Sequence, residues 1–344
     1  MMKRTKLSDQ VKAHAESEVK AKQEYEGSEK VISTGSTLLD LAISGGRFKG
    51  GGIPAGILVE IFGPSGAGKT VLLCEIAGAV QRQGGQIMFR DPEARLNKQF
   101  AQMFDLNVED MEYDNPDTVP KIFEPVRTWE PEPKDKVHGI FADSLAALTT
   151  DWELEDKDQY GMRRAKEFSE QCRMTCRTIT EKDFLMVCSN QIRQNLDAGP
   201  YGQKYKSPGG EAIGFYASLR LRCSSGIKIK EEQTIFGTKI KQVIGVETEV
   251  EVFKSSVWKP YRTAPLIIIF DYGIDSIRAD LKFLKQTRKD TTYMLAGQKL
   301  GQSINSAIQV VEEDNLEQTL KDEVIQVWNE IEEKFSHDRK PKQR

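Results

Sequence analysis

The chain has 344 residues, enough for one large α/β domain with one or two small additional units. Its 49 Lys and Arg nearly balance its 52 Asp and Glu, for a formal net charge of −3, so a nucleic-acid surface must be a local patch. The five cysteines form no C-x-x-C pair, which favours reduced core thiols over disulfides or zinc ligands. Because the N-terminus has no apolar segment and no run is long enough to span a bilayer, we expect a cytoplasmic protein without membrane partners.

The N-terminal residues 1 to about 30 are rich in Lys, Glu and Gln, with sparse apolar positions at helical spacing. This pattern predicts a helix with a thin apolar stripe, which either docks on another body or frays as a free terminus. The run Ser33–Thr37 then predicts a turn and a helix cap, and the Gly-rich stretch Gly45–Gly52 predicts a loop that leads into the apolar strand Ile57–Phe62.

A phosphate-binding loop of the form G-x-x-x-x-G-K-[ST] lies directly behind that strand. Its residues are Gly63, Pro64, Ser65, Gly66, Ala67, Gly68, Lys69 and Thr70. Glycines let successive backbone N–H groups converge on phosphate oxygens, while the lysine neutralises phosphate charge and the hydroxyl binds Mg²⁺. Residues 71–80 have helical apolar spacing and complete the strand–loop–helix setting of the motif. We therefore predict a site for a nucleoside triphosphate and Mg²⁺.

A carboxylate follows the next predicted strand, Gln86–Arg90, in the segment Asp91–Leu96. Since ligands bind at the carboxyl ends of parallel strands, Glu93 is a candidate base that orients and deprotonates a water in line with the γ-phosphate. A solvated acidic loop is the alternative. Residues 98–112 and Val119–Trp129 are predicted to be helical.

The segment Val137–Asp143 is an apolar strand that ends in an acid, the form of a Walker B element. We expect Asp143 to reach the Mg²⁺ shell, usually through water, and to complement the Thr70 hydroxyl. His138, within the same strand, is interpreted as a packing residue.

A basic region follows. Gly161–Lys182 predicts a helix with a basic stripe beside its apolar face, and the buried strand Phe184–Arg193 leads into the long loop Gln194–Gly210. Between Tyr160 and Lys206 there are nine Lys or Arg against five Asp or Glu, the reverse of the balance of the whole chain. Aromatic and basic residues interleaved with glycine suit contact with a nucleic-acid backbone, although a basic helix stripe alone is usually a solvated face.

The remaining chain predicts three further strands, followed by mainly helical patterns. The strands are Phe215–Cys223, Val246–Lys254 and Pro265–Phe270, which would extend the sheet with antiparallel members. After Gly273, helical patterns surround a short glycine-punctuated stretch and predict a small C-terminal domain. The predicted divisions are an oligomerisation helix and linker at 1–32, an ATPase core at 33–272, a C-terminal domain at 273–335 and a basic disordered tail at 336–344.

Several of these stretches together resemble the RecA family of DNA recombinases. They are Ile32–Ser36, the Gly63–Thr70 loop, Asp91–Leu96, Asp143–Thr149, Ser189–Arg193, Gly209-Gly210, Phe215–Leu221 and Gly297–Gln302. Phe270–Asp275 is similar to phage members of the family, so a phage source is an open alternative. The resemblance implies an α/β fold with a RecA-type P-loop ATPase core, a mainly parallel central sheet, an N-terminal helix that packs on the neighbouring subunit and a small α+β C-terminal domain.

The resemblance also implies roles for individual residues. Glu93 matches the catalytic glutamate, Gln191 matches the residue that senses the γ-phosphate, and Lys254 matches a lysine that reaches the neighbouring subunit's ATP. Asn97 and Phe100 fall where the family holds adenine. Ser169, Arg173 and Arg193 fall where the family contacts the DNA backbone, and the loops near 152–161 and 194–210 match its two DNA-binding loops. Within the second loop, the candidates for DNA contact are Lys204, Lys206, Gly209 and Gly210.

The chain departs from the family pattern in a second trans lysine, in the composition and length of the 194–210 loop, and in its tail. Ser256 stands where a second lysine in trans is expected, and Lys259 or Arg262 are candidates to compensate. The tail is basic, whereas bacterial RecA tails are usually acidic, so inhibition of DNA access by the tail is not expected.

The implied function is an ATP- and Mg²⁺-dependent recombinase that forms a helical homo-oligomeric filament on single-stranded DNA and pairs it with double-stranded DNA. Single-strand-binding and loader proteins are the accessory partners to expect. Two alternatives are a ring-forming replicative helicase with the same core, and a non-catalytic accessory that binds ATP and DNA to load another recombinase.

Overall fold

The computed structural model describes residues 30–149, 162–194, 205–206 and 212–336. The predicted N-terminal helix, the loop at 152–161 and most of the loop at 194–210 lie outside these residues. Within the described ranges, no helix combines the length and apolar character needed to cross a bilayer.

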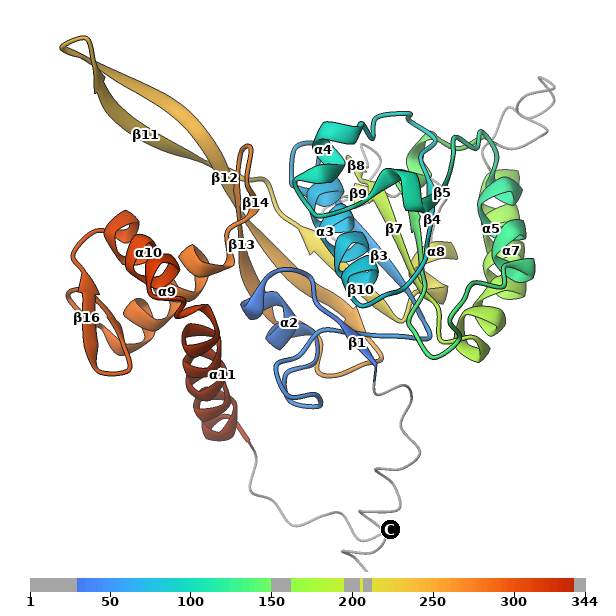
Figure 1. Ribbon diagram of the computed structural model, residues 1–344. Coiled ribbons are helices and arrows are strands. Elements are labelled where there is room, and N and C mark those ends of the chain that lie inside the picture. The colour runs from blue at the N-terminus through green and yellow to red at the C-terminus, as the bar shows by residue number, and fades with distance from the viewer. Residues whose placement is uncertain (1–29, 150–161, 195–204, 207–211, 337–344) are drawn as a thin grey trace, which may run out of the picture.

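A ten-stranded sheet forms the centre of the molecule (Figure 1). Its order is β14 (Gly273–Ile274), β13 (Thr263–Ile269), β12 (Thr238–Ser255), β10 (Leu219–Cys223), β3 (Ile57–Gly63), β7 (Leu185–Gln191), β6 (Gly139–Ala142), β4 (Ile87–Arg90) and β5 (Met111–Asp114), with β11 (Ile227–Ile235) paired to β12. The strands from β10 to β5 are parallel, and β11 to β14 are antiparallel. The predicted α/β fold, a mainly parallel sheet extended by antiparallel strands, is confirmed.

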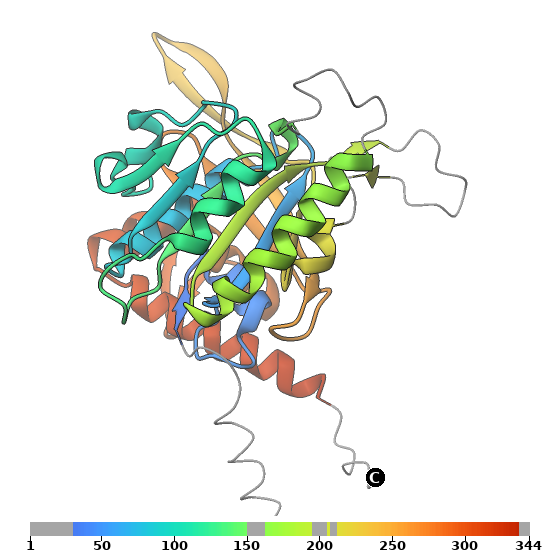
Figure 2. The same ribbon diagram turned by 90° about the vertical axis from the view of Figure 1, so that its right-hand side faces the viewer.

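Helices cover both faces of this sheet. On one face lie α2 (Thr37–Ser44) and α3 (Lys69–Arg82), and on the other lie α5 (Val119–Thr128), α7 (Met162–Glu181) and the short α8 (Ala212–Tyr216). Figure 2 shows α5 and α7, in green, in front of the sheet. Consecutive residues such as Leu58 and Val59 point into different apolar clusters, because side chains alternate along a strand. This two-sided burial explains why the parallel strands have continuous apolar sequences.

The C-terminal elements pack on the α2 side. They are α9 (Ser276–Arg288), the hairpin β15 (Tyr293–Leu295) and β16 (Gln298–Gly301), α10 (Ile304–Glu313) and α11 (Glu317–Lys334). Buried residues of α9, α10 and α11 belong to the same apolar cluster as α2 and α3. The C-terminal elements are therefore attached to the core through packed side chains.

The predicted helix over residues 98–112 is wrong. The segment contains α4 (Lys98–Gln102), a 3₁₀ turn η1 (Val108–Asp110) and the start of β5. Asp105 has a φ of 52°, which a continuous helix does not allow, and the Asn107 side chain caps η1 instead. The chain therefore turns and adds β5 to the edge of the sheet beside β4.

β11 and β12 form an antiparallel ribbon that is longer than the sequence predicts. The predicted strand Val246–Lys254 is only the second half of β12, and β11 is not predicted. Its signal was the alternation Ile227-Lys228-Ile229-Lys230. The turn at Phe236-Gly237 lacks the Asn-Gly pair that usually marks a two-residue hairpin.

The five cysteines are free thiols, as predicted, and four of them are buried. Burial raises the pKa of Cys176 to about 11 and that of Cys223 to about 12, so these thiols stay protonated near neutral pH. His138 is also buried, where Nδ1 accepts from the Gln86 N–H at 2.9 Å, consistent with a packing role.

Two buried carboxyl groups, one on α2 and one on α9, are held by nearby hydroxyl groups. Asp40 accepts from the Thr34 N–H and hydroxyl, each at 2.7 Å, and burial raises its pKa. Asp280 is 3% exposed and accepts from the Ser276 hydroxyl at 3.3 Å. The pKa of Asp280 is raised from 3.8 to about 7, because desolvation outweighs the lowering effect of the hydrogen bonds from Thr37 and Ser276 and of the Lys321 charge.

We expect Asp280 to make stability depend on pH. Its folded pKa exceeds its unfolded pKa, so the folded chain keeps the proton over a range in which the unfolded chain has lost it. The free energy of unfolding should then fall by a few kcal/mol as pH rises from about 4 to about 7, and flatten above. Denaturant unfolding of the wild type and Asp280→Asn across this range measures the effect. Parallel curves for the two proteins would contradict the assignment.

Candidate nucleotide-binding site

The phosphate loop lies between the carboxyl end of β3 and the first residue of α3. Gly66 and Gly68 have φ values of 73° and 81°, which favour glycine. A Cβ at Gly68 would lie 2.4 Å from Ile268 Cδ1, and one at Gly63 would lie 2.4 Å from the Cys223 carbonyl oxygen. At Gly66 the space is open. The loop is therefore tightly packed at Gly63 and Gly68 and open at Gly66, and it leads into the N-terminus of a helix, which suits a phosphate group.

The Lys69 side chain bends back over this loop. It is 9% exposed, and Nζ donates to the carbonyl oxygens of Gly63 at 3.1 Å and Pro64 at 2.7 Å. Desolvation lowers its pKa, while the nearby Asp143 and Glu93 act in the opposite direction. The amine is thus held above the open side of the loop, where a phosphate oxygen could replace a carbonyl as its acceptor.

Thr70 and Asp143 meet across two elements, as the sequence predicted. The Thr70 hydroxyl donates to Asp143 Oδ2 at 2.7 Å, and the Ser189 hydroxyl of β7 donates to Asp143 Oδ1. Mg²⁺ prefers oxygen ligands, keeps several waters and commonly takes only one or two protein groups besides phosphate oxygens. The Thr70 hydroxyl and the Asp143 carboxylate fit that requirement.

Glu93 and Gln191 are joined although they are almost a hundred residues apart. Gln191 Nε2 donates to Glu93 Oε1 at 3.3 Å, and Arg95 forms an ion pair with Glu93 Oε2 at 2.7 Å. Gln191 is the last residue of β7 and Glu93 follows β4, so both lie at the carboxyl edge that carries the phosphate loop. The alternative of a fully solvated acidic loop is disfavoured, because the Glu93 side chain is only 16% exposed.

The turn that presents Glu93 is built around Asp91. Its carboxylate accepts from the backbone N–H groups of Arg95 and Leu96, each at 2.8 Å, and from the Tyr113 hydroxyl at 2.9 Å. Asp91 is 1% exposed, so these bonds replace the water that it gives up.

Asn97 and Phe100 lie at the start of α4. The Asn97 side-chain oxygen caps the helix by accepting from the Phe100 N–H at 2.8 Å. The Phe100 ring packs edge-on against Phe104, with 5.1 Å between centroids. The two residues are thus neighbours beside the turn at Asp91–Leu96, and their predicted contact with adenine stays a prediction.

The predicted DNA-binding residues occupy two places. Ser169 is half-buried and Arg173 is exposed on α7, next to the buried Phe168 and Cys172. Arg193 on β8 (Arg193–Gln194) pairs in register with Lys206 on β9 (Tyr205–Lys206), so these backbones are adjacent. Lys204, Gly209 and Gly210 lie outside the described residues.

Lys254 contacts α8 of its own chain. Nζ donates to the carbonyl oxygens of Gly214 at 2.9 Å and Phe215 at 2.8 Å, and desolvation lowers its pKa. The two candidates to replace the missing second lysine contact Glu332 of α11 instead: the Lys259 amine lies at 3.3 Å, and Arg262 Nε donates at 2.9 Å.

A buried charge pair that the sequence did not reveal links these regions. Arg220 Nε donates to Glu60 Oε2 at 2.6 Å, and Asn190 Nδ2 donates to Glu60 Oε1 at 3.0 Å. The guanidinium lies 4.6 Å from the centroid of Phe62 and 5.3 Å from that of Phe253. The pair thus connects β7, one residue before Gln191, to β12, one residue before Lys254.

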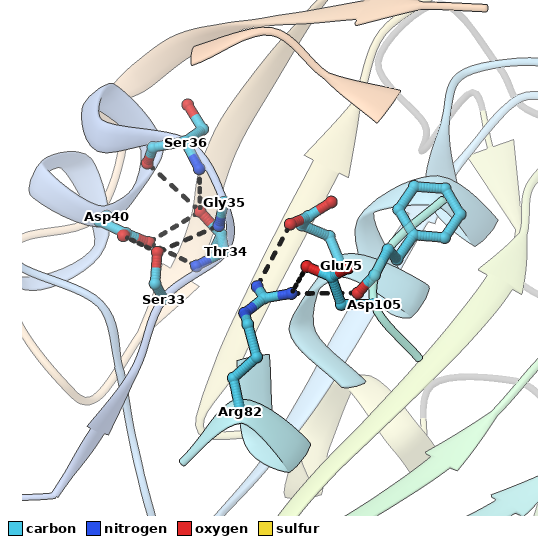
Figure 3. A network of polar contacts seen from close by, with 9 residues as sticks. Ser33, Thr34, Gly35, Ser36, Asp40, Glu75, Arg82 and Asp105 are labelled. Atoms are coloured by element: carbon cyan, nitrogen blue, oxygen red, sulfur yellow. Dashed lines mark hydrogen bonds and ion pairs between the residues drawn. The ribbon is translucent and has the colours of Figure 1, made fainter. Parts of the chain in front are cut away.

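The turn at residues 33–36 packs against α3, the helix that follows the phosphate loop, and Gly35 is the point of closest approach (Figure 3). Gly35 has a φ of 79°, and a Cβ there would lie 2.3 Å from Cγ of Glu75 on α3. Glu75 in turn pairs with Arg82 at 3.4 Å, and Arg82 lies 3.5 Å from Asp105. Burial raises the pKa of Glu75. The close approach of Gly35 therefore fixes the distance between the 33–36 turn and α3.

Residues 7–275 match the family model of the RecA N-terminal domain, which covers more than half of the chain. The chain belongs to the RecA family. It is 32% identical over 293 residues to Protein RecA of Delftia acidovorans (83% of this chain, 75% of the relative), and 35% identical over 256 residues to Protein RecA of Thermus thermophilus (73% and 70%). The crystal structure of the RadB recombinase matches with a TM-score of 0.48 and 17% identity, over 71% of this chain and 98% of that chain.

We expect Gly35→Ala to destabilise the protein by about 2–4 kcal/mol, because it adds the strain of a positive φ to a clash with α3. Gly297→Ala is the matched control, since Gly297 has a φ of 76° but open space at its Cβ. It should lose only about 1–2 kcal/mol. Urea unfolding of both variants measures the difference, and equal losses would show that contact with Glu75 is unimportant.

Proposed function

We propose that this RecA-family protein is an ATP-dependent DNA recombinase. It forms a helical filament of identical subunits on single-stranded DNA and exchanges that strand with a homologous duplex. ATP binds in the Gly63–Thr70 loop and is hydrolysed with Glu93 as the base.

The hydrogen bond between Gln191 and Glu93 is the observation that carries this proposal. Glu93 would align a water with a γ-phosphate held by Lys69 and Thr70. Gln191 lies two residues before Arg193, where the chain leaves the sheet for the proposed DNA loop. A terminal phosphate that draws Gln191 away from Glu93 would therefore shift the start of this loop, so that nucleotide state and DNA contact are coupled.

Within one subunit, the residues divide the work of hydrolysis. The loop N–H groups and Lys69 bind phosphate oxygens, and Thr70 with Asp143 holds Mg²⁺, which neutralises phosphate charge when bound. Arg95 restrains the Glu93 carboxylate from the side opposite Gln191. Neutralisation of Glu93 by Arg95 would weaken it as a base, so release of this exposed arginine is expected when nucleotide binds.

DNA would be held by its backbone. Arg173 on α7, together with basic residues of the loop that follows β7, supports contact with phosphates, and homology would be read by base pairing between strands. Affinity should then be independent of sequence and fall steeply with salt concentration. The neighbouring subunit's Lys254 would complete the ATP site alone, since Ser256 has no charge and Lys259 and Arg262 contact Glu332.

A strand-exchange assay tests the proposed function. We expect the wild type to convert circular single-stranded DNA and a homologous linear duplex into joint products with ATP and Mg²⁺. Lys69→Ala should abolish both ATP hydrolysis and exchange, because phosphate charge is no longer neutralised. ATP binding with hydrolysis that ignores DNA would favour a non-catalytic accessory, and unwinding of a forked duplex without exchange would favour a helicase.

Gln191→Ala should separate hydrolysis from its stimulation by DNA. The catalytic groups remain, so basal ATP hydrolysis should change by less than about threefold, whereas stimulation by single-stranded DNA should be lost. Arg95→Ala is the control, because it removes the other Glu93 contact without altering β7. Full stimulation of Gln191→Ala in a steady-state ATPase assay would exclude this residue as the link.

A further inference from the structure

The β11–β12 ribbon stands clear of the rest of the molecule (Figures 1 and 2). β12 pairs with β13 only from Gly245 onward and with β10 only from Val250 onward. From Thr238 to Ile244, its only strand partner among the described residues is β11. A two-stranded ribbon of this length is marginally stable by itself, so an additional role is indicated.

The register of the ribbon separates its side chains into two faces. Pairing of Ile227 with Glu247 and of Ile235 with Thr238 fixes which residues share a face. The lysine face carries Lys228, Lys230, Lys239 and Lys241 with Glu232. The isoleucine face carries Ile227, Ile229, Ile235 and Ile240 with Glu231.

Three isoleucines of this face are open to solvent in a single subunit, whereas Ile229 packs against the core. Ile227 is 75% exposed, Ile235 41% and Ile240 45%. Ile235 and Ile240 lie near the tip, whereas Ile227 lies at the base of the ribbon, with Glu231 between. Exposed apolar side chains on a projecting ribbon are unfavourable in water.

The tip of the ribbon adds a stronger observation. Phe236 and Gly237 form the two-residue turn, with φ values of 51° and 79°. Such a turn favours Asn-Gly, and a left-handed conformation costs a residue with a Cβ about 1–2 kcal/mol. Phe236 is also 102% exposed, so its ring gains no packing within its own subunit. A bulky aromatic in a strained, fully exposed position indicates a contact outside the subunit.

The direction of the ribbon identifies the partner. β10 runs parallel to β3 and ends at Cys223, beside the phosphate loop, so the ribbon that follows projects beyond the nucleotide edge of the sheet. Lys254 lies at the opposite edge, because Arg220, near the start of β10, pairs with it. A neighbour that brings its Lys254 to this ATP must cover the nucleotide edge, and its body then lies alongside the ribbon.

We propose that the β11–β12 ribbon is an assembly arm that binds the adjacent copy of this chain. Phe236, Ile235 and Ile240 pack on that copy, and the lysine face is turned away from it. The inference rests on the proposed filament, in which subunits stack across the ATP site. The arm contributes to assembly and leaves nucleotide binding by a single subunit unchanged.

Phe236→Asn tests the arm without endangering the fold, because asparagine suits the turn better than phenylalanine. With ATP, Mg²⁺ and single-stranded DNA, the protein concentration for half-maximal assembly in light scattering should rise by about tenfold or more. Nucleotide affinity measured below the assembly concentration should stay unchanged. The control Lys230→Gln/Lys241→Gln alters the opposite face and should assemble like the wild type with a non-hydrolysable ATP analogue in the absence of DNA.

A photo-crosslinking amino acid at position 236 identifies what the tip touches. Cross-links between subunits that require ATP support the arm. Cross-links to DNA instead, or normal assembly of Phe236→Asn, overturn the arm and leave the proposed recombinase intact. A wild-type protein that does not assemble with ATP and DNA overturns both the arm and the proposed filament.

Discussion

The order of the parallel strands is the constraint on which the site depends. β3 and β4 are consecutive in the chain, yet β7 and β6 lie between them in the sheet. Their carboxyl ends therefore bring the phosphate loop, Gln191, Asp143 and Glu93 into one row along the same edge. A neighbouring placement of β3 and β4 would leave no strand from which Asp143 could meet Thr70.

Contacts extend from the proposed ATP site at this edge to other parts of the molecule. Gln191 ends β7 and precedes the proposed DNA loop, while the buried Glu60–Arg220 pair extends from Asn190 towards β12. Glu60 is fully buried, and a buried ion pair is retained only when its hydrogen bonds are satisfied. Removal of one partner would leave an uncompensated buried charge, so the pair restrains Asn190 and Arg220 relative to each other.

Local patterns predicted the parts of the site that depend on neighbouring residues. The Gly63–Thr70 loop needs its glycines for reasons that sequence alone reveals, and an apolar strand ending in Asp143 is equally local. The Glu60–Arg220 ion pair and the raised pKa of Asp280 were not predicted, because both depend on residues that only the tertiary fold brings together. The prediction of one helix over residues 98–112 was wrong because Asp105 adopts a left-handed conformation, and no glycine at this position marks it in the sequence. Glu93 was a candidate base from its position after a strand, and the resemblance added the proposed role of Gln191; the tertiary fold brings the two side chains into contact.

Most of the β11–β12 ribbon was not predicted, because its turn lacks the residues that usually mark a hairpin. Natural hairpins of this length use turn residues that relieve strain, and Phe236 does the opposite. Local sequence and local structure disagree here, and such disagreements concentrate where function outweighs stability. The two faces of the ribbon fit the proposed arm: the lysine face would stay in water, whereas the isoleucine face would become favourable when another subunit removes it from water. Assembly would then be conditional on a neighbour held at the nucleotide edge, so the arm would strengthen ATP-dependent stacking without replacing it.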